Sequence, residues 1–436
     1  MKWTKYHLSV PIGANTVLIN YRNNAVIALD KALAEKMNAL GEVEAMQHWH
    51  PTLYEELCQM DFLVDDTLDE AAQYMEELDQ RRLSKSRLTI TVNPTLDCNL
   101  RCWYCYEQHQ RGSMMTKETI QNIIDFVHEQ CQSEELKRID LSFFGGEPLM
   151  GFHRCVQPLV EAIKDLCETH DKQLYLSFTT NAVLLTPKKV DWLCNTGLPL
   201  FMQIPFDGGR GIHDETKHDA KGHACYDTTL DHVRYALERG VEVTVRCNYT
   251  AKNIESFRQL IEELHGMKGR EKASVAFQMV WQEQPNDELQ AKVDELMKLA
   301  SDYQLSPSQN GQTQSCFYQQ LCYADRPHNV VINYDSHVFQ CTAREFCESN
   351  AVGKLTTGGK IAYSARYDGR RDQYYLPCCK DCLMLPVCEI CSQKRFETTN
   401  GQCPANMTEE KAKHHLIQKA MKIIGFPSTK DPSADE

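Results

Sequence analysis

One loop of the chain predicts its architecture, and it reads Asp97-Cys98-Asn99-Leu100-Arg101-Cys102-Trp103-Tyr104-Cys105-Tyr106. Its cysteines are spaced Cys-x3-Cys-x2-Cys and follow an apolar, β-branched segment at residues 88–96, which has the composition of a buried strand. Three thiolates in one loop can hold three irons of a [4Fe–4S] cube and leave the fourth iron without a protein ligand. An open coordination position is typical of catalytic metal sites. The alternatives are a zinc knuckle or a complete four-cysteine cluster, but the loop lacks a fourth ligand.

The segments around this loop alternate between strand and helix patterns. Strand candidates lie at residues 88–96, 139–144, 174–180, 200–206, 241–249 and 274–281. Helix-length segments include residues 116–130, 253–265 and 287–303. Strands alternating with helices predict a parallel α/β sheet, and because the usual barrel has eight strands, we expect an open, partial (β/α)6 barrel. Active sites on such sheets form at the C-terminal ends of the strands.

The composition narrows the class of protein. With 436 residues the chain is too long for one compact core, so we expect two or three domains. The formal net charge of −13 argues against a broad phosphate-binding surface, so we expect no nucleic-acid partner. The chain has 20 cysteines but neither an apolar signal core at its N-terminus nor an apolar run of membrane-spanning length. We therefore expect a cytoplasmic protein without a membrane partner, whose reduced cysteines bind metal.

Three zones divide the sequence, at residues 1–84, 85–305 and 306–436. The first contains two strand candidates, two helical segments and a polar run that predicts a solvated helix or linker, at residues 6–10, 16–21, 29–40, 52–60 and 70–87. The last zone contains ten of the 20 cysteines and has no long apolar runs. This pattern predicts a small domain held together by metal rather than by a large core.

The cysteine loop resembles the signature of the radical S-adenosylmethionine (SAM) superfamily, in which an aromatic residue, here Tyr104, precedes the last cysteine. The resemblance implies that Cys98, Cys102 and Cys105 hold a [4Fe–4S] cluster whose open iron binds the amino and carboxylate groups of SAM. One electron then cleaves the sulfonium to give a 5′-deoxyadenosyl radical, which abstracts a hydrogen atom from the substrate. The cofactor supplies the difficult chemistry, while the protein positions and shields it.

A turn at the end of the second predicted strand agrees with this resemblance. Gly145, Gly146 and Glu147 precede a proline and are similar to the family's GGEP motif, which meets the amino group of SAM. The two glycines permit a close backbone approach, and Glu147 offers a charged acceptor for an ammonium group. The resemblance therefore assigns these three residues, together with Tyr104, to SAM binding.

Three further strand-end residues join the expected SAM site. Thr180 and Asn181 end the third strand, where similar enzymes contact ribose or carboxylate, although helix capping explains them equally well. Residues 203–207 and 213–214 are similar to the family's fourth-strand segment. Arg246 lies among apolar residues of the fifth strand and needs a partner, which is either the carboxylate of SAM or an acidic residue of the barrel.

The C-terminal cysteines are similar to the SPASM domain that follows many radical SAM barrels. Eight thiolates can hold two further four-iron clusters. The resemblance assigns auxiliary cluster I to Cys316, Cys322, Cys341 and Cys391, and auxiliary cluster II to Cys379, Cys382, Cys388 and Cys403. With the SAM cluster, this makes three [4Fe–4S] clusters.

This C-terminal pattern departs from the family in two ways. Ser336 stands where the hairpin before Cys341 usually has glycine, and Cys388 and Cys391 are separated by two residues where the family commonly has three. Cys378 also neighbours Cys379, so the ligand sets stay open. The alternative for all of these cysteines is a pair of zinc sites, because Cys-x2-Cys spacing suits zinc well.

The resemblance implies an oxidoreductase that acts on a peptide. A SPASM domain points to peptide or protein substrates, and residues 1–84 resemble the small domains with which peptide maturases grip a precursor's leader as an added strand. We therefore expect a peptide maturase that forms a carbon–sulfur or carbon–carbon crosslink and takes electrons from a flavodoxin or ferredoxin. The alternatives are a sulfatase-type maturase that makes formylglycine, or a non-catalytic iron–sulfur or zinc protein. Residues 1–84 would otherwise be a structural cap.

Overall fold

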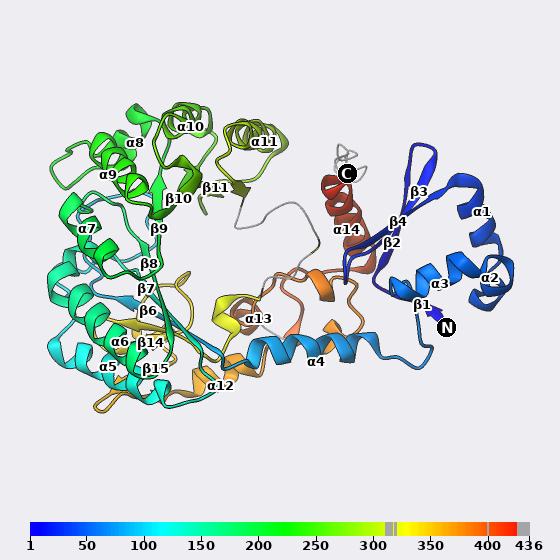
Figure 1. Cartoon of the computed structure of the whole chain (residues 1–436), viewed down its shortest axis with the longest axis horizontal. Helices are drawn as coiled ribbons and strands as arrows, with labels where there is room; N and C mark the ends of the chain where they lie inside the picture. The colour runs from blue at the N-terminus through cyan, green and yellow to red at the C-terminus, as the bar shows by residue number, and fades with distance from the viewer. Residues whose placement is uncertain (310–316, 318–320, 399–400, 425–436) are drawn as a thin grey trace. The chain divides into compact units, whose positions relative to one another are not determined.

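The computed structural model describes residues 1–309, 317, 321–398 and 401–424 (Figure 1). The chain forms two compact units, each assembled from separate parts of the sequence. The larger comprises Ser84–Thr313 and Pro327–Asp368, and the smaller comprises Met1–Leu83, Gln314–Arg326 and Gly369–Glu436. The division into zones 1–84, 85–305 and 306–436 was drawn from composition and stays a prediction.

An eleven-stranded sheet forms the larger unit, in the order β12-β11-β10-β9-β8-β7-β6-β13-β14-β15-β16. Its consecutive parallel strands are β6 (Arg87–Asn93), β7 (Arg138–Phe143), β8 (Gln173–Thr179), β9 (Leu200–Phe206), β10 (Glu242–Tyr249), β11 (Ala273–Met279) and β12 (Pro307–Gln309). The predicted parallel α/β sheet is confirmed, and β12 extends it by one short strand.

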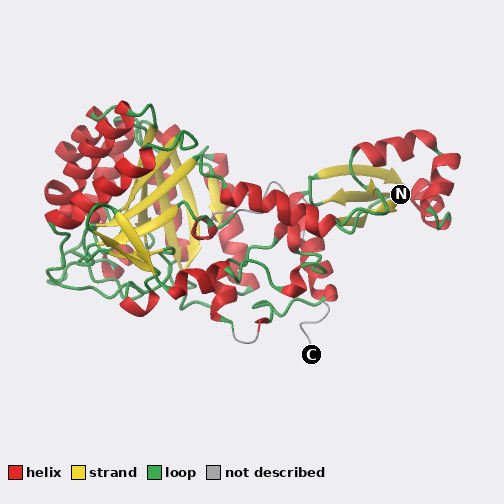
Figure 2. Cartoon of the chain, turned by 90° about the horizontal axis from the view of Figure 1, so that it is seen from below, coloured by secondary structure: helices red, strands yellow, loops and turns green. Residues whose placement is uncertain are grey.

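Helices form an outer layer around these strands (Figures 1 and 2). They are α5 (Lys117–Cys131), α6 (Gln157–Thr169), α7 (Pro187–Asn195), α8 (Arg210–Thr216), α9 (Tyr226–Glu238), α10 (Phe257–His265) and α11 (Asp287–Asp302). The start of α5 is fixed by Thr116, whose side chain accepts a hydrogen bond from the backbone N–H of Thr119 and so satisfies one of the free N–H groups of the first turn.

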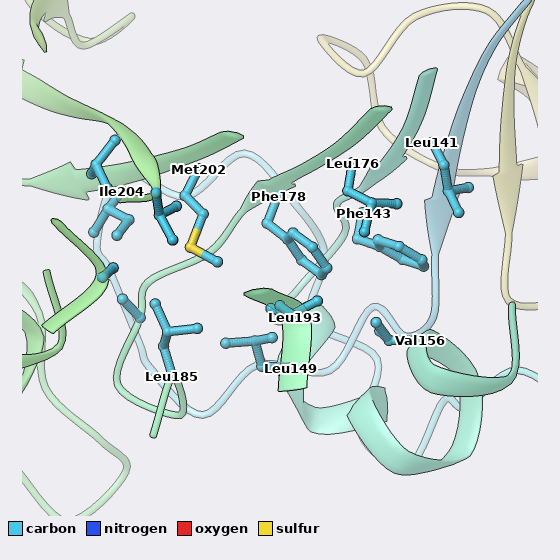
Figure 3. Packing of buried hydrophobic residues seen from close by; sticks show 14 of the residues in the cluster. Leu141, Phe143, Leu149, Val156, Leu176, Phe178, Leu185, Leu193, Met202 and Ile204 are labelled. Atoms are coloured by element: carbon cyan, nitrogen blue, oxygen red, sulfur yellow. The ribbon is translucent and has the colours of Figure 1, made fainter. Parts of the chain in front are cut away.

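The core of the larger unit lies between the sheet and the helices (Figure 3). Successive side chains of a strand face opposite sides, so alternate residues of each strand enter this layer. The strand register pairs Phe143 with Phe178, and their rings stack with centroids 4.9 Å apart. The intervening positions are often polar, such as Ser177 and Thr179 on β8, and face the other side of the sheet. This alternation leaves polar side chains for a site.

Four strands after the barrel extend the same sheet. They are β13 (Asn329–Asn333), β14 (His337–Phe339), β15 (Gly353–Thr356) and β16 (Lys360–Tyr363). Strand β13 pairs in parallel with β6, and the other three continue antiparallel. The turn between β13 and β14 contains Ser336 at φ 71°, a left-handed conformation that favours glycine. This conformation explains why glycine is the usual residue at that position.

A small antiparallel sheet opens the smaller unit. It consists of β2 (His7–Ile12), β3 (Asn15–Asn20) and β4 (Ala25–Asp30), and a second pair joins β1 (Lys2–Trp3) to β5 (Leu63–Val64). The helices are α1 (Lys31–Ala39), α2 (Val43–Trp49), α3 (Pro51–Gln59) and α4 (Glu70–Leu83). The predicted helix at residues 29–40 begins only at Lys31, because the preceding residues form β4 and Asp30 caps the helix by accepting a hydrogen bond from the N–H of Leu33.

The N-terminal and C-terminal segments of this unit share one hydrophobic core. Tyr6, Tyr21 and Tyr74 pack with Leu385 and with Leu416 of α14 (Glu409–Ile423). The hydroxyl groups of Tyr21 and Tyr74 also donate hydrogen bonds to backbone carbonyls of the cysteine-rich segment. Tyr21 donates to Leu383 at 3.0 Å, and Tyr74 donates to Pro386 at 3.1 Å. The fold of the cysteine-rich segment therefore depends on residues of the first zone. Two further α-helices are described in the C-terminal region, α12 (Ala365–Arg371) and α13 (Ser392–Glu397).

No helix in the described part of the chain combines the length and the apolar composition that crossing a membrane requires.

Candidate active site

The three cysteines of the loop after β6 line one cavity of about 180 Å³. Tyr104 and Arg246 line the same cavity, as do four residues from the ends of neighbouring strands: Gly145, Gly146, Thr180 and Asn181. The structure thus gathers nine of the ten residues that were predicted for the SAM site and its cluster, all except Glu147. Because the β6, β7 and β8 strands run in parallel, the loops at their C-terminal ends meet at this edge of the sheet.

Phe144, which precedes the glycine turn, also lines the cavity.

Burial keeps the thiols of this loop protonated in the absence of a metal. Desolvation raises the pKa of Cys98 and of Cys102 to about 12, and it raises the pKa of Cys105 as well. Metal binding needs thiolates, so a bound cluster would release these protons. Among the described residues, no three His, Cys, Asp or Glu side chains converge on a single-ion site. A four-iron cube instead attaches each thiolate to a different iron, so it requires three cysteines around one shared cavity. The donor set fits that requirement.

A buried network holds the cysteine loop through Tyr104. Its hydroxyl donates to Asp207 Oδ1 at 2.6 Å and accepts from Asn248 Nδ2 at 3.0 Å. Asp207 pairs through Oδ2 with the ammonium of Lys217 at 3.3 Å, and both side chains are almost fully buried. Because Asp207 follows β9 and Asn248 lies on β10, two strands fix the aromatic ring that precedes Cys105.

Asn181 connects the end of β8 to the same loop. Its Nδ2 donates to Asn99 Oδ1 at 2.9 Å and lies 3.7 Å from Cys98 Sγ, while its backbone N–H donates to Glu147 Oε2 at 2.9 Å. The hydroxyl of Thr180 donates to Glu147 Oε1 at 2.7 Å. Together, Thr180 and Asn181 therefore connect the cysteine loop to Glu147.

The glycine turn packs tightly against the base of the loop. Gly145 has φ 101°, and a Cβ atom on Gly146 would lie 2.1 Å from the carbonyl oxygen of Asp97, so only glycine fits. Glu147 is fully buried and accepts hydrogen bonds from Thr180, Leu149 and Asn181. The structure thus places its carboxylate behind the cavity lining, where it supports the residues that face the cavity.

Arg246 extends from β10 to the cavity, and burial lowers its pKa. Its Nε has no hydrogen-bond partner, and no carboxylate of the described residues lies within ion-pair distance of its guanidinium. A buried guanidinium needs an anion. The carboxylate of a bound SAM would supply this anion, and Asp207 is a barrel acid whose charge acts on the guanidinium from beyond ion-pair distance.

The C-terminal cysteines gather in the smaller unit. Cys379, Cys382, Cys388 and Cys403 line one cavity of about 350 Å³, which brings together the full set predicted for auxiliary cluster II, with Cys378 beside it. Of the set predicted for cluster I, the thiols of Cys322 and Cys391 are hydrogen-bonded to each other. Cys341 belongs to the larger unit, and Cys316 lies outside the described residues.

Three polar residues near these sites were missed in the sequence. Lys217 occurs four residues after His213 and pairs with Asp207, and Arg395 follows Cys391 by one helical turn and reaches the cavity of Cys388. Glu107 follows the cysteine loop, is half-buried and lines the first cavity, and desolvation raises its pKa to about 8. The signal that the sequence offers for these residues is a charge within four positions of a cysteine or histidine of a motif.

Comparisons with known proteins agree with this geometry. Residues 92–264 match the sequence profile of the radical SAM superfamily. The radical SAM cyclopropyl synthase TigE of Paramaledivibacter caminithermalis is 26% identical over 180 residues, which cover 37% of this chain and 36% of TigE. The match thus spans about a third of that relative.

Two solved structures share the fold over most of the chain. A structure of anSMEcpe with bound AdoMet has a TM-score of 0.56 at 16% identity and covers 78% of this chain and 96% of its own. SuiB of Streptococcus suis bound to S-adenosylmethionine has a TM-score of 0.53 at 16% identity, with coverage of 94% and 99%. At this identity the likeness shows a common fold.

Proposed function

We propose that this chain, which carries a radical SAM domain over residues 92–264, modifies a ribosomally made precursor peptide by forming a carbon–sulfur or carbon–carbon crosslink. The observation that carries the peptide part of this proposal is the unpaired edge of the small sheet β2-β3-β4. Such an edge binds an extended peptide by adding it as a further strand. A further solved structure adds support, since SuiB has also been solved bound to the precursor peptide SuiA.

The cavity of the larger unit would hold the cofactors. Cys98, Cys102 and Cys105 would bind the [4Fe–4S] cluster, and Arg246 would bind the carboxylate of SAM. When bound, SAM and the reduced cluster supply a 5′-deoxyadenosyl radical. The chain's own part is to fix the loop through Tyr104 and Asp207 and to exclude water from the cavity. We propose a flavodoxin or ferredoxin as the electron donor.

The outer edge of β4 is better suited to strand addition than that of β2. Strand β2 contains Pro11, which lacks an N–H group and therefore cannot donate a hydrogen bond to an added strand. Strand β4 has no proline, and the side chains of Val26, Ala28 and Asp30 are exposed along it. In the described part of the chain, β4 pairs with β3 alone.

The hydrogen-bond pattern identifies the backbone groups that a leader would meet. Lys31 N–H donates to the carbonyl of Ala14, so these two residues form a hydrogen-bonded pair of the β3–β4 ladder. Because such pairs alternate along an antiparallel ladder, Leu29 and Ile27 also bond to β3, while the residues between them point their N–H and C=O groups outward. Those residues are the exposed ones of β4.

A formylglycine-forming maturase is the second candidate, because anSMEcpe, whose fold is shared over 72% of this chain, has been solved with the Cp18Cys peptide. The match to SuiB covers 94% of this chain, and SuiB has also been solved with a precursor peptide, which favours modification of a precursor peptide. The chemistry of the product distinguishes the two candidate functions. Formylglycine is an aldehyde and reacts with hydrazides, whereas a carbon–sulfur or carbon–carbon crosslink does not.

The test uses the full chain, reconstituted with iron and sulfide under anaerobic conditions. SAM, dithionite and each short peptide encoded beside the gene are added, and 5′-deoxyadenosine and the peptide mass are measured. We expect one of these peptides to lose hydrogen, to form an internal bond seen by tandem mass spectrometry, and to be inert to a hydrazide. Reconstituted enzyme that cleaves SAM but leaves every such peptide unchanged contradicts the proposal, and a hydrazide-reactive product supports the second candidate instead.

A further inference from the structure

Arg395 is a buried arginine at the cavity of the predicted auxiliary cluster II. It lies on α13, and 5% of its surface is exposed. Its Nη2 donates to Cys388 Sγ at 3.6 Å, and its Nη1 donates to the backbone carbonyl of Tyr374. The guanidinium therefore lies between a fixed backbone acceptor and a sulfur of the cavity, which determines its orientation.

Asp325 is a carboxylate whose charge acts on Arg395, and it does so from beyond ion-pair distance. No Asp or Glu of the described residues lies within the 4.0 Å that defines an ion pair with its guanidinium. An unpaired buried charge is costly, so the site needs an anion. Thiolates in this cavity would supply the missing negative charge.

We infer that Arg395 is the counter-charge of the iron–sulfur cluster in this cavity, and that its hydrogen bond to Cys388 raises the reduction potential of that cluster. The inference rests on the proposed function, which places a [4Fe–4S] cluster on these four cysteines. Reduction adds a negative charge to a cluster, and a nearby positive charge or a hydrogen bond to sulfur stabilises the reduced form. Arg395 is thus a positioning and tuning residue that acts through Cys388.

The test replaces Arg395 in the full chain and measures potentials. Arg395→Gln removes the charge, and Arg395→Lys keeps it but loses the planar pair of donors. Both are made in a background with Cys98, Cys102 and Cys105 changed to alanine, so that the SAM cluster does not contribute. Iron and sulfide are counted, and midpoint potentials are measured by anaerobic redox titration followed by electron paramagnetic resonance.

Arg82→Gln is the matched control. Its guanidinium lies 4.0 Å from the centroid of the Tyr374 ring, but it pairs with Asp79 and makes no hydrogen bond to a sulfur of the described residues. We expect Arg395→Gln to shift one midpoint to a more negative potential, Arg395→Lys to shift it less, and the control to shift neither auxiliary midpoint.

Two results would overturn the inference, and they are distinguishable. Parental midpoints in Arg395 variants that keep their iron show that the arginine does not tune the cluster. If Arg395→Gln fails to assemble iron, Arg395→Lys decides: a midpoint below the parental value supports the inference, and a parental one overturns it. Zinc instead of iron in the parent's cavity refutes the proposed cluster itself, and this is seen before any Arg395 variant is compared.

Discussion

Replacing Ala28 by proline removes one backbone N–H group from β4 and so tests whether this edge binds the leader peptide. The N–H of Ala28 points away from β3, so its loss breaks no bond of the small sheet. Proline is tolerated on an edge strand when its nitrogen faces solvent. A peptide added to β4 would instead lose the N–H of residue 28 as a hydrogen-bond donor, and one of the peptide's carbonyl groups would be left unpaired beside the proline ring. The substitution therefore affects the added strand and spares the folded chain.

The expected loss follows from that unpaired carbonyl. Leaving a buried acceptor unsatisfied costs about 1–3 kcal/mol, which corresponds to a roughly 5- to 150-fold weaker Kd. Binding is measured by fluorescence anisotropy of the labelled precursor on anaerobic enzyme. We expect the KM for the precursor to rise by a similar factor, while peptide-independent SAM cleavage stays at the parental rate because the SAM cavity lies in the larger unit.

Ala28→Val is the control, because it keeps the N–H and adds a side chain of high strand propensity. It should bind the precursor as the parent does. If Ala28→Pro keeps its iron content and its melting temperature and still binds the precursor with parental affinity, strand addition to β4 is refuted. The small sheet would then be a structural cap, and the leader would bind elsewhere.

Three further predictions concern cofactors and stability. Changing Cys98, Cys102 and Cys105 to alanine should remove about a third of roughly 12 irons per chain and abolish 5′-deoxyadenosine formation, as measured by iron assay and chromatography; unchanged iron would contradict the ligand set. Arg246→Gln should weaken SAM binding by at least about tenfold in equilibrium dialysis without loss of iron, and parental binding would remove Arg246 from the SAM site. Deleting residues 1–83 should lower iron content through loss of the shared core, whereas a deletion variant with full iron would show that the cysteine-rich segment folds alone.

Much of the larger unit could be predicted because its signals are local. The strands β6 to β11 are apolar and β-branched, and motif residues at their ends meet because parallel strands place their C-terminal ends at one edge. Strand β4 was not predicted, and its last two residues were assigned to the helix expected at residues 29–40. Alanine and leucine also suit a helix, so only the pairing with β3 decides between strand and helix here.

The contacts that were missed depend on how the chain folds back on itself. Packing of Tyr21 against Leu385 joins segments more than three hundred residues apart, which no local pattern reveals. The bond from Arg395 to Cys388 depends on how α13 folds back over the cysteines. Glu147 is buried and accepts hydrogen bonds from three protein donors, and the contact with SAM that its motif predicts stays a prediction.

The most direct test of peptide modification by radical chemistry is isotope transfer from peptide to cofactor product. The precursor is prepared with deuterium on the carbon-bound positions of its core residues and incubated with reconstituted enzyme, SAM and dithionite. We predict that deuterium appears in 5′-deoxyadenosine in step with modification of the peptide, because the hydrogen atom is abstracted from the peptide itself. Modified peptide accompanied by 5′-deoxyadenosine that carries no deuterium, with every carbon-bound position labelled, would contradict the account.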